Sequence, residues 1–202
     1  DCLLSRGLGD VYKRQDDRTD SAILKMFHMS RKDEPFADVI ASLKLTPVSI
    51  SYEYDPCDQA KARELYTRAT TGSYTKQPGE DDKSIGLGIT GYKGRVHVHF
   101  GDPITSGFED AKQLAALTDA QILTGYRLFP VHYLAYAMWS ERDPQLDVPA
   151  AESLFDAAEL AAATEQWQQR LGRCPSEQQP YLILQYAMPV RNQYRIKAGV
   201  PL

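Results

Sequence analysis

Two histidine–aspartate pairs in this chain have a spacing that suits acid–base chemistry. His28 is followed by Asp33, and His97 by Asp102, each as His-x4-Asp. In such a pair the carboxylate orients the imidazole, which takes a proton from a substrate hydroxyl. However, His28 lies in a continuous helical pattern, and His97 lies in an alternating strand that ends before Asp102. We therefore expect neither pair to be catalytic.

The same strand offers His97 and His99, two positions apart, as metal ligands. A zinc site needs three or four protein ligands, and no third Cys or His lies nearby in the sequence. The acidic run Glu80-Asp81-Asp82 suits the first turn of a helix, where carboxylates complement the helix dipole. The sequence therefore predicts a solvated strand face and no metal site.

Residues 86–91, GLGITG, match the G-x-G-x-x-G pattern of dinucleotide-binding loops, with Glu109 as a candidate ribose-binding acid. That mechanism needs a strand before the glycines and a helix N-terminus after them, to receive the pyrophosphate. Here a charged helical stretch comes first and the strand VHVHF follows. We predict a flexible turn, and a nucleotide-binding domain using Gly86–Gly91 stays as an alternative.

The composition is that of a globular protein with no concentrated charge. The 202 residues carry a formal net charge of −4, and Lys and Arg are scattered, so we expect no nucleic-acid partner. Cys2, Cys57 and Cys174 lie far apart without a CxxC pair. This spacing fits a reducing compartment and argues against a zinc knuckle or a disulfide framework.

Targeting and membrane-spanning patterns are also missing from the sequence. The N-terminus has no signal-peptide pattern, and no window holds 18 uninterrupted apolar residues. The nearest candidate, residues 120–139, contains Arg127, Pro130 and His132, so we expect a buried or interfacial helix. We predict a cytoplasmic location, with peripheral contact on the inner face of the cytoplasmic membrane as the alternative.

The periodicity predicts an α/β fold made of two strands among helices, followed by a helical tail. Helices are expected over 21–32, 35–44 and 58–69, the last closed by Gly72, and over the first part of 81–92. After Asp110, helices are expected over about 118–141, 149–171 and 176–197. Strands are expected over 45–54 and 94–100, the first burying the face of Val48, Ile50, Tyr52 and Tyr54. A stable sheet normally needs three or more strands, so we expect further strands to be missing or supplied elsewhere.

Residues 1–15, DCLLSRGLGDVYKRQ, do not join well to the sequence that follows. They resemble a translated sequencing-adapter tail and are set aside from fold prediction. The alternative is a natural, poorly ordered N-terminus.

Three blocks carry a family resemblance: TPVSISYEYDPCD, GITGYKGRVHVHFG and QYAMPVRNQY, in this order. The chain from about Asp16 onwards resembles the downstream half of bacterial phospholipid/glycerol acyltransferases, close to the lysophosphatidate and glycerol-3-phosphate enzymes. The resemblance implies a partial acyltransferase-type sheet flanked by helices in residues 16–108. Residues 109–202 would form a helical C-terminal extension.

The resemblance implies acyl transfer from a thioester donor, acyl-CoA or acyl carrier protein, to a glycerol-phosphate or lysophospholipid hydroxyl, with no cofactor. In this family a His-x4-Asp pair supplies the general base, and a Glu-Gly-x-Arg block helps to hold the phosphate. Asp17, Arg18 and Thr19 match the end of that block, while VYKRQ stands where its start belongs. Both His-x4-Asp matches follow it, so we expect the catalytic pair upstream and this chain alone to be inactive.

The binding residues implied by the resemblance are few. Arg18 is the candidate phosphate contact, since an Arg can hold phosphate with two hydrogen bonds; a solvated arginine is the alternative. Lys93 and Arg95 flank the second strand as weaker candidates for phosphate or anionic lipid. Pro47 is expected to shape the first strand.

The aromatic residues of 126–139 leave a third possibility open. Tyr126, Phe129, Tyr133, Tyr136 and Trp139 could rest at a membrane interface and make the chain a non-catalytic membrane-associated module. A helix packed on the core is the simpler prediction, because the polar face is not strongly basic.

Overall fold

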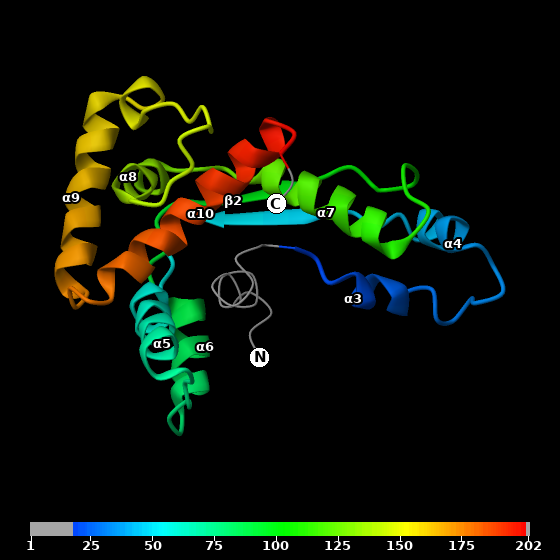
Figure 1. Ribbon diagram of the computed structural model, residues 1–202, viewed down its shortest axis with the longest axis horizontal. Coiled ribbons are helices and arrows are strands. Elements are labelled where there is room, and N and C mark those ends of the chain that lie inside the picture. Colours follow the sequence, from blue (N-terminus) through cyan, green and yellow to red (C-terminus); the bar gives the residue numbers. More distant parts are fainter. Residues whose placement is uncertain (1–17, 201–202) are drawn as a thin grey trace.

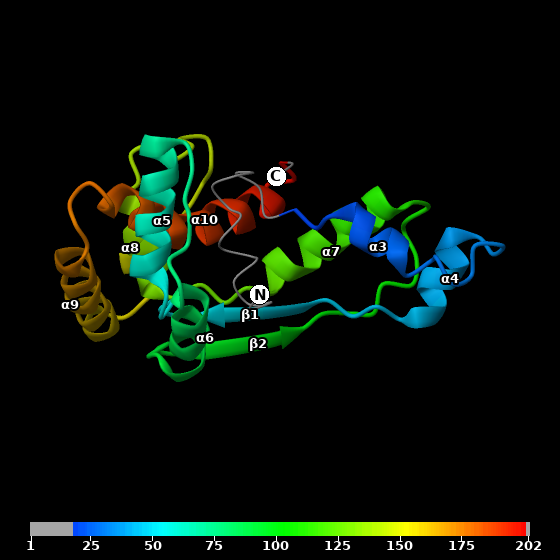
Figure 2. The same ribbon diagram turned by 90° about the horizontal axis from the view of Figure 1, so that it is seen from below.

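The computed structural model describes residues 18–200 of the chain. Helices α3 (Ser21–Met26) and α4 (Phe36–Leu43) lie at one end of the molecule with α7 (Ala111–Gly125). Helices α5 (Asp58–Thr71), α6 (Glu80–Thr90), α8 (Pro130–Met138) and α9 (Ala157–Arg173) lie at the other end. Strands β1 (Val48–Tyr52) and β2 (Val96–Phe100) run between the two groups (Figures 1 and 2). The last helix, α10 (Gln179–Lys197), packs on α5, α7 and α8.

Side-chain caps begin several of these helices. The carboxylates of Asp20, Asp110 and Asp156 accept hydrogen bonds from backbone N–H groups in the first turns of α3, α7 and α9. Gly72 ends α5 as predicted, with a left-handed φ of 80° that a residue without Cβ adopts at little cost. These local signals are strong because each satisfies backbone groups that the helix itself leaves unpaired.

Strands β1 and β2 form an antiparallel pair in which Ile50 lies opposite Val98, and Val48 opposite Phe100. The prediction that β1 buries its apolar face is wrong for the strand itself. Ser49 and Ser51 are buried, whereas Val48 and Ile50 are 40% and 37% exposed. Side chains alternate along a strand, so the apolar residues of both strands share the exposed face.

The C-terminal end of α7 explains which face is buried. The Ser49 hydroxyl donates to the Ile122 carbonyl oxygen at 2.9 Å, and the Ser51 Oγ accepts from the Arg127 N–H at 2.9 Å. Gly125 comes so close that a Cβ there would lie 2.4 Å from His99 Cδ2 and 2.5 Å from Ser49 Oγ. Only small polar residues of β1 fit beneath this helix end, so polarity and burial are reversed relative to the usual pattern.

Two hydrophobic clusters hold the described part of the chain together. The larger one joins α8, α9 and α10 with Tyr54 and Ala62, and it includes the aromatic side chains of Trp167, Tyr186 and Phe129. The smaller one joins α3, α4 and α7 around Ile40, Phe108 and Leu114. In both clusters, helices after residue 109 pack against elements that precede it.

The mixed α/β prediction is confirmed at the level of a small two-stranded sheet flanked by helices. The helix predicted over 118–141 is instead two helices, α7 and α8. Phe129 is extended because the ring of a following proline disfavours helical backbone, and Pro130 then opens α8. The helix predicted over 149–171 begins only at Ala157, after the Asp156 cap and a short 3-10 turn, Ala151–Ser153.

Two other predictions were wrong in detail. Residues 86–90 of GLGITG are helical, as part of α6, and do not form a flexible turn. Helix α3 ends at Met26, well short of residue 32, because the chain turns back and a His28 ring nitrogen lies 2.7 Å from the Glu34 carbonyl oxygen. Residues 1–15, resembling an adapter, lie outside the described residues.

Candidate functional site

A buried ionic cluster connects the turn after β1 to the helical tail. Asp58, at the start of α5, is 2% exposed. Its carboxylate accepts hydrogen bonds from Arg170 of α9 at 2.6 Å and from the Tyr186 hydroxyl of α10 at 2.7 Å. The Arg170 guanidinium also lies over the Tyr54 ring, 4.3 Å from its centroid. The turn and two distant helices are therefore fixed to one another.

Burial dominates the electrostatics of this cluster. It raises the pKa of Asp58, although the Tyr186 hydrogen bond and the Arg170 charge oppose the rise. Burial and the nearby carboxylate together raise the pKa of Tyr186 well above its ordinary value. Each polar group in the cluster has a partner inside the protein, so the cluster is suited to positioning these elements.

Arg95, a candidate for phosphate or lipid contact, is already engaged inside the protein. It donates to Glu53 at 2.8 and 3.0 Å and to Glu159 at 2.5 Å, with its guanidinium 4.9 Å from the Phe129 ring centroid. Burial alone would raise the pKa of Glu53, but the hydrogen bonds from Arg95 outweigh it and the pKa is lowered. Lys93 likewise donates to the backbone carbonyls of Ile89 and Gly91.

Neither His-x4-Asp match forms a hydrogen-bonded pair among the described residues. A ring nitrogen of His28 lies 2.7 Å from the carbonyl oxygen of Glu34, and the ring packs edge-on against Phe36. At the second match, His99 and not His97 shares a hollow of about 460 Å³ with Asp102, together with Gln121. This geometry supports the sequence argument against a catalytic role for either pair.

Arg18 is exposed at the start of the described chain, and its neighbour Thr19 is anchored. The Thr19 backbone N–H and hydroxyl both donate to the carboxylate of Asp119 on α7, at 2.9 and 2.5 Å. Asp119 is buried, so this contact fixes the entry into α3. The backbone next to Arg18 is therefore held in place, while Arg18 itself is exposed.

The glycine motif is placed where it cannot work as a phosphate loop. Gly86 and Gly88 lie inside α6, and Gly91 is the residue that ends it. The positive end of a helix dipole is its N-terminus, whereas the motif occupies the C-terminal half. Pyrophosphate at these glycines would meet carbonyl oxygens instead of free N–H groups.

Most of the aromatic residues expected on a membrane-facing stripe are in the core. Phe129, Tyr133 and Tyr136 are buried, and Trp139 is half-buried against the same cluster. The simpler prediction, a helix packed on the core, is confirmed for these residues. No helix among residues 18–200 combines the length and apolar character needed to cross a bilayer.

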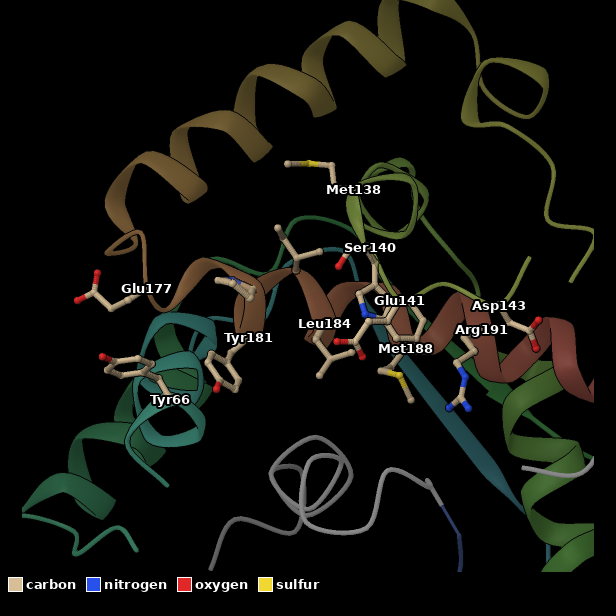
Figure 3. A pocket seen from close by; sticks show the side chains of 13 residues that line it. Tyr66, Met138, Ser140, Glu141, Asp143, Glu177, Tyr181, Leu184, Met188 and Arg191 are labelled. Atoms are coloured by element: carbon tan, nitrogen blue, oxygen red, sulfur yellow. The ribbon is translucent and has the colours of Figure 1, made fainter. Parts of the chain in front are cut away.

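A cavity of about 650 Å³ lies where α8 and the chain after it meet α5 and α10 (Figure 3). Its size falls within the roughly 300–1,000 Å³ range of small-molecule sites. Tyr66 and Glu177 mark one end, and Asp143 and Arg191 the other. Side chains that are apolar or mostly apolar make up much of the lining: Met138, Trp139, Pro180, Tyr181, Ile183, Leu184 and Met188.

Arg191 is the cation that lines this cavity, beside the acids Glu141, Asp143 and Glu177. It makes no ion pair within 4.0 Å among residues 18–200, where the described bridges use other groups. Burial, and then repulsion from Arg195, lower the pKa of Arg191; attraction by Asp143 does not compensate.

Comparison with known protein families, with curated proteins and with solved structures finds no match to this chain. The site must therefore be argued from its own chemistry. Among residues 18–200, no three His, Cys, Asp or Glu side chains converge as metal ligands.

Apart from Trp139, which was considered only as part of a membrane-facing stripe, the sequence argument did not single out the cavity residues. Leu184, Met188 and Arg191 lie at i, i+4 and i+7, so they share one face of α10. An arginine on a stripe that is otherwise apolar was the available signal. It is weak by itself, because long basic side chains often cover apolar surface.

Proposed function

We propose that this chain belongs to an acyltransferase that moves an acyl chain from a thioester donor to a glycerol-phosphate or lysophospholipid hydroxyl. The donor would be acyl-CoA or acyl carrier protein, and no cofactor is needed. The chemistry is proton removal from the hydroxyl by a neutral histidine as the hydroxyl attacks the thioester carbonyl. The family places that histidine ahead of the region matched here, so no catalytic residue is assigned within residues 18–200.

One observation carries the proposal: the blocks that resemble the acyltransferases are connected in space. TPVSISYEYDPCD and GITGYKGRVHVHFG contain β1 and β2, which pair with each other. QYAMPVRNQY lies in α10, and its Tyr186 hydrogen-bonds both the Asp58 carboxylate and the Asp55 N–H of the first block. Matching segments that form one scaffold support a shared origin better than scattered matches would.

Arg18 is the residue proposed to contact the acceptor phosphate. It is exposed, and the anchoring of Thr19 to Asp119 limits how far its backbone can move. A guanidinium on a fixed backbone loses less freedom on binding than one on a loose chain end. A cytoplasmic protein in peripheral contact with the inner face of the membrane would meet both substrates.

The first test uses this chain as it stands. With acyl-CoA and lysophosphatidate we expect no release of CoA thiol, but saturable lysophosphatidate binding measured by calorimetry. Arg18→Ala should weaken that binding, while Lys25→Ala, a matched change on α3, should not. Turnover by the chain alone would contradict the assignment of catalysis to an upstream segment.

The second test concerns an intact copy of the reading frame. We expect its sequence before Asp16 to read R-E-G-R and, further up, His-x4-Asp. The longer protein should release CoA thiol when lysophosphatidate is added, and replacing its upstream histidine with alanine should stop the reaction. A longer frame without the pair would remove the assignment.

The nucleotide-binding alternative is weaker on this geometry. A domain using Gly86–Gly91 would be stabilised by its ligand, whereas we expect no change in melting temperature with millimolar NAD. A reproducible rise in melting temperature that Gly88→Ala abolishes would restore it. A non-catalytic membrane-associated module would need a surface other than the buried Tyr133 and Tyr136.

A further inference from the structure

The cavity between α5, α8 and α10 carries charged groups at both ends, and Leu184 and Met188 lie between them, beside Ser140 and Glu141. Leu184 and Met188 of α10 line this cavity. Met138, the last residue of α8, and Trp139, which follows it, line the cavity as well. Figure 3 shows Arg191 at one end and Glu177 at the opposite end. A long apolar wall with a cation at one end fits an amphipathic ligand whose chain lies along the wall.

The charges indicate the sign of the head group. Arg191 makes no ion pair within the described part of the chain, and the attraction of Asp143 does not offset its burial. An anion beside the guanidinium could accept two parallel hydrogen bonds from it. Glu177 lies at the far end of the cavity, where it would contact the chain terminus and not the head.

The charged residues of the lining also limit how much negative charge the head group of the ligand can carry. Three acids line the cavity with one arginine, so a doubly charged phosphate would be repelled more strongly than a single carboxylate. We propose that this cavity binds a long-chain carboxylate, with Arg191 on the carboxylate and the Leu184–Met188 wall on the chain. The site does not include Arg18, and the inference does not depend on the acyl-transfer proposal.

The experiment is a calorimetric titration of the chain with dodecanoate below its micelle concentration. Dodecanol, dodecyl phosphate and dodecylamine are matched ligands that change only the head group. We expect dodecanoate to bind most tightly, with roughly tenfold higher affinity than dodecanol, because dodecanol cannot form the charge-assisted pair with Arg191. Tighter binding of dodecylamine would overturn the anionic head group, and tighter binding of dodecyl phosphate would overturn the carboxylate.

Variants test the residues. Arg191→Met keeps the length and apolar stem, and it should reduce dodecanoate affinity roughly tenfold or more while leaving dodecanol unchanged. Arg173→Met, exposed at the end of α9 and outside the cavity, should change neither. Equal affinity of the Arg191→Met and parent proteins for dodecanoate would overturn the role of Arg191. The head-group series on the parent protein keeps the inference testable even if this variant folds poorly.

Tryptophan fluorescence locates the ligand. Of the two tryptophans in the chain, Trp139 lines the cavity, and Trp167 is buried in the core. A brominated dodecanoate should quench the emission, and Trp139→Phe should remove most of that quenching. Quenching that persists undiminished in this variant would place the ligand elsewhere and overturn the site.

Discussion

The Oδ2 atom of Asp58 lies 2.6 Å from Nη1 of Arg170, although the two residues are 112 positions apart in the chain. The Asp58 side chain is 2% exposed and that of Arg170 is 18% exposed. The pair therefore offers a direct measure of how firmly the helical tail is attached to the turn after β1.

Breaking this pair from one side should be costly. Arg170→Met leaves a buried carboxylate with hydrogen bonds from the Tyr186 hydroxyl and the Gln59 N–H but no cation, and we expect a loss of about 3 kcal/mol in the free energy of unfolding. Asp58→Asn with Arg170→Met removes both charges and should recover much of that loss. Urea denaturation of the two single variants and the double variant measures the coupling; simple additivity would mean that the pair contributes nothing specific.

The exposed sheet face gives a second prediction. Ile50→Thr and Val98→Thr should change the free energy of unfolding by no more than about 0.5 kcal/mol, because both residues lie on the exposed face of the sheet, at 37% and 47% exposure. Ser51→Val should cost about 1–3 kcal/mol, since it leaves the Arg127 N–H without its acceptor. Urea denaturation of the three variants measures these changes in the free energy of unfolding. The reverse order would mean that the apolar face is the buried one, as the sequence pattern predicted.

This reversal shows where prediction from the sequence reached its limit. Alternation identified both strands and the two sets of side chains in β1, but it could not say which set faces α7. The usual assumption that apolar residues point inward failed because Gly125 and its neighbours approach too closely for anything larger than serine. That approach depends on residues more than 70 positions away in the chain.

Other features were predictable because their causes are local. The Asp20 cap, the end of α5 at Gly72 and the course of the last helix all follow from neighbouring residues. The cavity was not predictable, because Tyr66, Trp139 and Arg191 come from three separate segments. Only packing brings them together. The Arg95 pairings were missed for the same reason, since Glu53 and Glu159 are 42 and 64 residues away.

His132 gives a prediction about pH. Its ring is fully buried, Nδ1 accepts the Phe129 N–H at 2.9 Å, and burial lowers its pKa to about 4. His132 of the unfolded chain therefore becomes protonated near pH 6.5, whereas in the folded chain it stays neutral down to about pH 4. The free energy of unfolding therefore falls as the pH drops from 6.5 towards 4. Between pH 7 and pH 5 we expect a loss of about 2 kcal/mol in the free energy of unfolding.

The control for this prediction is His132→Asn, whose side-chain oxygen can still accept the Phe129 N–H. Its stability should be lower overall but nearly flat between pH 7 and pH 5. Glu53, with its lowered pKa, loses stabilisation only as pH falls below about 4.5, outside this window. An unchanged pH slope in the asparagine variant would assign the acid sensitivity to another group.

Two glycines provide a matched pair for the last prediction. Gly125→Ala places a methyl group 2.4 Å from His99 Cδ2 and 2.5 Å from Ser49 Oγ, closer than packed atoms tolerate. The end of α7 or the sheet must shift, and we expect a loss of about 1–3 kcal/mol. Gly172→Ala, inside α9 with nothing within 4 Å of the new methyl group, should instead stabilise the protein by about 0.5–1 kcal/mol. Thermal melts of both variants compare the same chemical change in two environments. If Gly125→Ala proved neutral, the close contact of α7 with β1, which sets the buried face of the sheet, would have to be abandoned.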